Sequence, residues 1–102
     1  MKRQFALLSI ALLLVACAGS KKMQPTAADV ERMNSSGSSI DLASLNEGYT
    51  LYEANCGKCH ALEAPSSHSV ADWEQILPAM FPKTKLTDSE QAKVRAYVMA
   101  RR

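Results

Sequence analysis

Little in this sequence could build a β-sheet or a general hydrolytic site. No stretch shows the strict alternation of apolar and polar residues that is typical of a half-buried strand. The chain also lacks a glycine-rich phosphate loop and a Ser-His-Asp signature, and it has only four glycines and two histidines. These absences argue against nucleotide-binding and acyl-transfer enzymes and favour an all-α protein.

Neither positive nor negative charge dominates the sequence. The chain has 12 Lys and Arg residues against 10 Asp and Glu residues. Two of the basic residues, Lys2 and Arg3, lie in an N-terminal stretch that we expect to be removed, so the remaining chain is near neutral. It has no basic stripe, and its aromatic residues are not interleaved with Lys or Arg. The sequence therefore predicts no nucleic-acid partner.

Residues 1–16 have the pattern of an export signal. Lys2 and Arg3 form a basic start. Residues 5–15 are an almost unbroken apolar run, and the small residue Ala16 follows it. The run has about a dozen residues, whereas a membrane span needs about 20. A retained transmembrane helix is therefore the weaker alternative, and we predict that residues 1–16 are cleaved.

Cys17 follows this signal directly. The segment Leu14-Val15-Ala16-Cys17 resembles the lipobox of bacterial lipoproteins, in which the cysteine is acylated and becomes the new N-terminus. The resemblance implies a lipid anchor on Cys17 at the periplasmic face of a bacterial membrane. Ala18 favours the outer membrane over the inner one. The alternative is a signal that ends in small residues, with a cysteine there by chance.

Residues 17–43 are interpreted as the lipidated cysteine and a flexible linker. Ser, Gly, Ala and charged residues dominate, and Gly37 has two serines on each side. As a random coil, about 26 residues would reach roughly 30 Å on average. A short helix within residues 26–33 is the alternative for part of this segment. The folded domain is predicted to be residues 44–102.

The domain contains the motif Cys56-Gly57-Lys58-Cys59-His60, which has the C-x-x-C-H pattern for covalent attachment of a c-type haem. On a helical turn, the i, i+3 spacing places the sulfurs of Cys56 and Cys59 on one side. Each sulfur can form a thioether with a haem vinyl group, and the imidazole of His60 can bind the iron. The motif therefore predicts one covalently bound haem c.

A C-x-x-C pair can also form a redox-active dithiol or bind zinc. A thioredoxin-like dithiol needs a βαβ framework around the motif, and no alternation of strand and helix is present. A structural zinc site needs four strong ligands. Beyond the motif and Cys17, the only further thiol or imidazole is His68, so a tetrahedral site would lack its fourth ligand.

Three helices are predicted in the domain from capping residues and apolar periodicity. The first begins with the capping box Ser44–Glu47 and runs toward Cys56. The second begins at Ser69 and should end or kink just before Met80, because Pro78 lacks a backbone N–H. The third begins with the capping box Thr87–Glu90 and buries Val94, Tyr97 and Val98.

The stretch from Glu47 to His60 resembles the opening of a small bacterial class I cytochrome c. The resemblance covers roughly residues 45–99 and implies a small all-α domain wrapped around one haem. In this family, a helix glycine four residues before an aromatic residue lets the first helix cross closely over the last one. Gly48 and Tyr52 match the first helix, and Val94 and Tyr97 match the last.

The resemblance also implies the axial ligands of the iron. His60 would be the proximal ligand, with its Nδ1–H held by the carbonyl of Pro65, although Pro65 could instead be only a turn residue. Met80 would be the sixth ligand. The sequence departs from the family here, because Phe81 separates Met80 from Pro82.

Three alternatives for the sixth ligand stay open. His68 would give bis-histidine ligation, which would lower the reduction potential. Met99 lies near the chain end and is the weakest candidate. Met80 itself could instead be a core residue, which would leave the sixth site open.

Two functions follow from these alternatives. With two protein ligands, the protein would be an electron carrier between redox partner proteins, not an enzyme, and would need no small-molecule substrate. With an open or weakly ligated sixth site, it would bind or sense small diatomic gases. The candidate distal region, residues 73–81, is apolar apart from Glu74 and Gln75, which favours the electron carrier.

Overall fold

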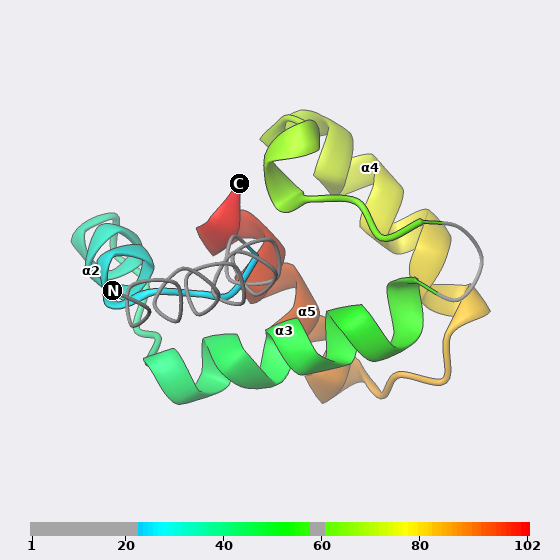
Figure 1. Cartoon of the computed structure of the whole chain (residues 1–102), viewed down its shortest axis with the longest axis horizontal. Coiled ribbons are helices and arrows are strands. Elements are labelled where there is room, and N and C mark those ends of the chain that lie inside the picture. Colours follow the sequence, from blue (N-terminus) through cyan, green and yellow to red (C-terminus); the bar gives the residue numbers. More distant parts are fainter. Residues whose placement is uncertain (1–22, 58–60) are drawn as a thin grey trace, which may run out of the picture.

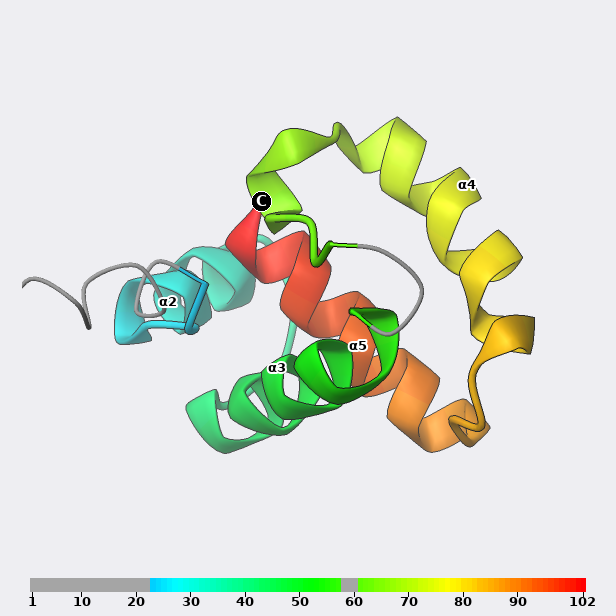
Figure 2. The ribbon, with the colours of Figure 1, turned by 45° about the vertical axis from the view of Figure 1, so that its right-hand side comes forward.

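The computed structural model describes residues 23–57 and 61–102, and every regular element in these two ranges is a helix. The elements in chain order are α2 (Ala27–Ser35), α3 (Leu42–Cys56), the 3₁₀ turn η1 (Pro65–Ser67), α4 (Val70–Met80), the 3₁₀ turn η2 (Phe81–Lys83) and α5 (Asp88–Arg101). The predicted all-α class is confirmed for these residues. Figures 1 and 2 show α3 and α5 crossing, with α2 near the C-terminal end of α5 and α4 arching outside the crossed pair.

The crossing of α3 and α5 depends on Gly48. A Cβ atom at this position would lie 2.9 Å from the Cβ of Tyr97 and would overlap the carbonyl oxygen of Lys93. Only a residue without a side chain lets the two backbones approach this closely. The close crossing that we expected at Gly48 is therefore confirmed.

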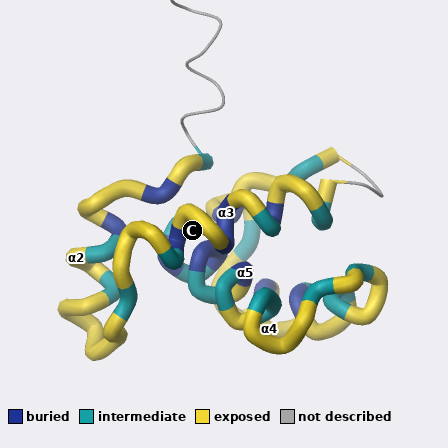
Figure 3. Tube along the Cα trace, turned by 90° about the horizontal axis from the view of Figure 1, so that it is seen from below, coloured by how far each residue is buried: buried dark blue, intermediate teal, exposed yellow. Residues whose placement is uncertain are grey.

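The core forms around aromatic rings at this crossing. Tyr97 is fully buried, and its ring centroid lies 5.3 Å from that of Tyr49 and 5.5 Å from that of Tyr52. Trp73 of α4 joins the cluster edge-on, with its centroid 6.4 Å from that of Tyr52. Figure 3 shows the buried positions of α3 and α5 gathered where these helices meet. The other buried apolar side chains are those of Leu45, Leu77, Val94, Val98 and Ala100.

Two of the three predicted helix starts are confirmed. At the start of α4, the Ser69 hydroxyl accepts the Asp72 N–H at 3.1 Å. At the start of α5, Thr87 and Glu90 form the reciprocal capping box. Both pairs satisfy N–H groups that have no partner within the helix.

The predicted capping box at Ser44 is wrong. Helix α3 begins at Leu42, because the carboxylate of Asp41 accepts the Ser44 N–H at 2.8 Å. This backbone hydrogen bond lowers the pKa of Asp41, and a negative charge there also interacts favourably with the helix dipole. Glu47, the expected partner in the box, instead pairs with Lys93 of α5.

Of the two outcomes predicted at Pro78, an end or a kink, the first is wrong, because α4 does not end before Met80. It continues through Pro78 to Met80, and η2 follows at once. Pro78 removes only its own N–H from the hydrogen-bond ladder. The N–H of Phe81 donates to the carbonyl of Leu77, so backbone bonding resumes after the proline.

Helix α2 lies within the segment that the sequence analysis interpreted as a flexible linker. Thr26 begins it with a capping box to Asp29, whose side chain is buried. The Asp29 carboxylate lies 2.9 Å from the Arg32 guanidinium and 3.6 Å from that of Arg101 in α5. The Tyr97 hydroxyl donates to the carbonyl of Met23. These contacts dock residues 23–35 onto α5.

Candidate functional site

Cys56 is the last residue of α3, and Gly57 caps the helix. The thiol is free and half-buried, and burial raises its pKa. In this environment the thiol is therefore mostly protonated and a weaker nucleophile than an ordinary cysteine. Cys59 and His60 lie outside the described residues, so the second thioether and the proximal ligand stay predictions.

A small cavity brings Cys56 together with Met80. Its volume is about 40 Å³, whereas roughly 10–15 Å³ is enough to hold one water molecule. The two sulfur-bearing side chains reach it from the last residues of α3 and α4. The rest of the lining is largely aromatic and aliphatic: Tyr52, Glu63, Trp73, Ile76 and Leu77.

Met80 reaches this cavity from inside a helix. We expected Pro78 to free Met80 from α4, but Met80 keeps helical backbone angles and forms the last residue of the helix. Its side chain is half-buried. Met99, the weakest candidate ligand, packs against the hydrophobic core and is not part of the cavity lining.

His68, the alternative sixth ligand, contacts two residues of the cavity lining but does not line the cavity itself. Its Nε2 lies 3.0 Å from the carboxylate of Glu63, and its ring meets Trp73 edge-on at a centroid distance of 5.1 Å. Glu63 lines the cavity, whereas His68 does not. Of the two candidate sixth ligands, Met80 lines the cavity together with Cys56, and His68 does not.

The carbonyl of Pro65 has a partner that the sequence analysis missed. The buried indole Nε1 of Trp73 donates to it at 2.7 Å. A carbonyl oxygen has two lone pairs, so this bond leaves room for the second donor predicted from His60. The signal that could have revealed the bond is Trp73 itself, because a buried indole N–H usually finds a hydrogen-bond partner.

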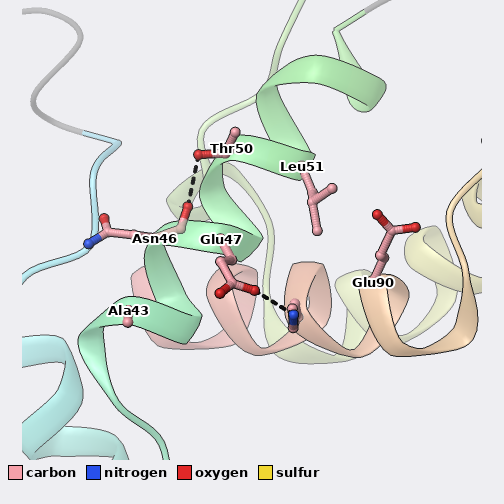
Figure 4. Close-up of a pocket in the computed structure, with 7 residues that line it drawn as sticks. Ala43, Asn46, Glu47, Thr50, Leu51 and Glu90 are labelled. Carbon is pink, nitrogen blue, oxygen red and sulfur yellow. Dashed lines mark hydrogen bonds and ion pairs between the residues drawn. The ribbon is translucent and has the colours of Figure 1, made fainter.

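A larger hollow lies elsewhere, in the outer groove between α3 and α5. Its volume is about 550 Å³. Two residues of its lining, Glu47 and Lys93, form an ion pair that raises the pKa of Lys93, and Figure 4 shows Glu47 on the α3 side of the groove. No thiol, thioether or imidazole lines it, so the smaller cavity at Cys56 is the candidate site. The groove is lined by Ala43, Asn46, Glu47, Thr50, Leu51, Glu90 and Lys93.

The predicted signal, residues 1–16, and the predicted lipidation site, Cys17, lie outside the described residues. Within the described ranges, no helix is long and apolar enough to cross a membrane. In the same ranges, no three His, Cys, Asp or Glu side chains gather into a group that could hold a metal ion. Comparison with known protein families, curated proteins and solved structures yields no match to this chain.

Proposed function

We propose that this protein is a monohaem c-type cytochrome that carries single electrons between redox partner proteins. A lipid on Cys17 would anchor it at the periplasmic face of a bacterial membrane, with the outer membrane favoured. The observation that carries the proposal is the convergence of Cys56, from the C-x-x-C-H motif, and Met80 on one apolar cavity.

The donor set suits a c-type haem. Cys56 would supply a thiol for a thioether, and Met80, which lines the same cavity, would supply a soft thioether sulfur. The cavity of about 40 Å³ is smaller than a porphyrin, so haem binding would have to widen it. The widening would have to occur between α4, which arches outside the α3–α5 pair (Figure 2), and the end of α3 that carries Cys56.

Each residue then has a defined task. Cys56 and Cys59 would hold the haem covalently, while His60 and Met80 would serve as the ligands of its iron. The haem would supply a single redox centre that alternates between Fe(III) and Fe(II). Two protein ligands would hold the iron in both states, and the apolar side chains of Ile76 and Leu77 would limit the access of water to it. No substrate has to bind.

Intact-mass analysis tests the proposal directly. The protein is produced in a bacterial strain with a working haem-maturation system, and a strain without that system provides the control. We expect one additional haem per chain only in the first strain, and loss of the stable adduct in the Cys56→Ala, Cys59→Ala double variant. A bare polypeptide from the competent strain would overturn the proposal.

A further inference from the structure

Helix α2 is held against α5 on both sides of Asp29. Before the helix, the Tyr97 hydroxyl donates to the carbonyl of Met23. Within the helix, the Arg32 guanidinium donates to the carbonyl of Ala100 near the end of α5. Asp29 itself is 1% exposed and forms ion pairs with arginines of both helices. Figures 1 and 2 show α2 beside this end of α5, so α2 belongs to the folded body.

An exposed connection follows α2. Residues 36–39 are all exposed, and Gly37 has a positive φ of 98°, with no atom within 4 Å of the position that a Cβ would take. Two hydrogen bonds between Asn34 and Ile40 bridge the turn, and both are exposed to solvent. A helix of nine residues, such as α2, is too short to persist alone in water. If its contacts with α5 break, α2 should therefore unfold and join this connection.

The docking of α2 changes the length of chain between the predicted lipid and the folded body. Met23 is six residues after Cys17, and six residues span at most about 20 Å even when fully extended. With α2 undocked, the folded body would begin at Leu42, which is 25 residues after Cys17. That length of chain can extend to roughly 85 Å.

We propose that docking of α2 on α5 sets the length of the membrane tether, so that the domain has a short reach when α2 is docked and a long reach when it is released. The inference rests on the lipid anchor at Cys17 in the proposed function. In the docked state, Met23 stays within about 20 Å of the acylated residue. The domain is then kept beside its own membrane, within reach of redox partners held in that membrane.

The test inserts the same six Gly and Ser residues at two places in the full lipidated protein. The protein is bound to a supported phospholipid bilayer, and neutron reflectometry measures the distance of the domain from the lipid. An insertion after Ser20 should move the domain outward by roughly 10–20 Å, because it lengthens the segment that spans this distance. An insertion after Gly37 should leave the distance unchanged, because docked α2 connects Met23 directly to the folded body.

A proline in α2 tests the long tether. Val30→Pro removes the hydrogen bond from the Val30 N–H to the carbonyl of Thr26 and should break this short helix. Amide exchange in α2 should rise more than tenfold, and the insertion after Gly37 should now move the domain outward. Val70→Pro is the matched control, because Val70 is the first residue of α4, where proline is favoured. In that control, α2 should stay docked.

Three results would overturn the inference and leave the proposed function intact. One is an equal outward shift for the two insertions in the otherwise unchanged protein, which would show that α2 does not hold the domain. Another is no shift for either insertion, and the third is an unmoved domain when Val30→Pro is combined with the insertion after Gly37. Mass spectrometry of the same samples reports the lipid. Its absence from Cys17 would instead overturn the anchor in the proposed function, and this inference with it.

Discussion

Gly48 of α3 lies directly against the backbone of Lys93 in α5, with no room for a side chain between them. In an isolated helix, alanine would be favoured over glycine by about 1 kcal/mol. Overpacking a core typically costs about 1–3 kcal/mol. Because the overlapping atom is a backbone carbonyl oxygen, which cannot rotate away, we expect the overlap to outweigh the helix propensity.

We therefore expect Gly48→Ala to lower the free energy of unfolding by about 1–2 kcal/mol. Urea denaturation followed by circular dichroism would measure the change. Gly57→Ala is the matched control, because its new Cβ would lie no closer than 3.5 Å to any neighbouring atom. A Gly48→Ala protein as stable as the wild type would contradict the close crossing.

The docking of α2 should depend on the charge of Asp29. Burial alone would raise the pKa of this carboxyl group, but the Thr26 N–H, Arg32 and Arg101 together lower it below its ordinary value. The stabilisation is then complete above the unfolded-state pKa of about 3.9 and is lost as the pH falls through the lower folded value. We expect exchange protection in α2 to be constant from about pH 7 to pH 5 and to fall below about pH 4.

Asp29→Asn should abolish this pH dependence. Loss of the charge leaves the two arginines without their buried partner, and we expect the docked state of α2 to be weakened by about 1–2 kcal/mol at neutral pH. This expected weakening is at the low end of the range for a buried ion pair, because the Arg32 side chain is more than half exposed. Protection in α4, measured in the same samples, separates undocking of α2 from global unfolding. Unchanged protection of α2 in the variant would contradict the role of Asp29.

Met80 should be visible in the optical spectrum of the oxidised protein. A weak long-wavelength band from sulfur-to-iron charge transfer is expected in the wild type and should vanish in Met80→Ala. Met99→Ala is the control, because Met99 packs against the core and does not line the cavity. If the band persists in Met80→Ala, Met80 is not the ligand.

Carbon monoxide distinguishes an electron carrier from a gas-binding protein. With the sixth position held by Met80, we expect the ferrous protein to bind carbon monoxide slowly and incompletely. Stopped-flow absorbance would measure the rate, and Met80→Ala should bind much faster. Rapid and complete binding by the wild type, without displacement of a ligand, would favour the gas-binding alternative.

The membrane anchor should depend on a single residue. We expect the mature protein to carry acyl chains on Cys17 and to be found in the membrane fraction, since several acyl chains hold far more firmly than one. Cys17→Ser should remove the lipid and release the protein from the membrane. Mass spectrometry of the N-terminal peptide measures the modification, and a Cys17→Ser protein that stays on the membrane would exclude lipid anchoring at this residue.

Local patterns predicted the helices well and their ends less well. Ser69 and Thr87 begin helices as expected, because each cap is a bond between residues close in the sequence. The start of α3 moved to Leu42 because Asp41 offers a competing cap, and α4 continues through Pro78 because the next N–H groups resume the ladder. Neither the start of α3 nor the continuation of α4 through Pro78 can be predicted from the identity of one residue alone.

The sequence by itself predicts the chemistry of this protein from local features: the C-x-x-C-H spacing, the small number of other candidate ligands and the helix-forming periodicity. Only the tertiary structure decided that Met80, and not His68, shares a cavity with Cys56. It also decided that Asp29 docks part of the presumed linker onto α5 and that Trp73 holds the Pro65 carbonyl. The physical reason is the same in each case. These contacts join residues on different segments, and their formation depends on how the helices pack around the Gly48 crossing.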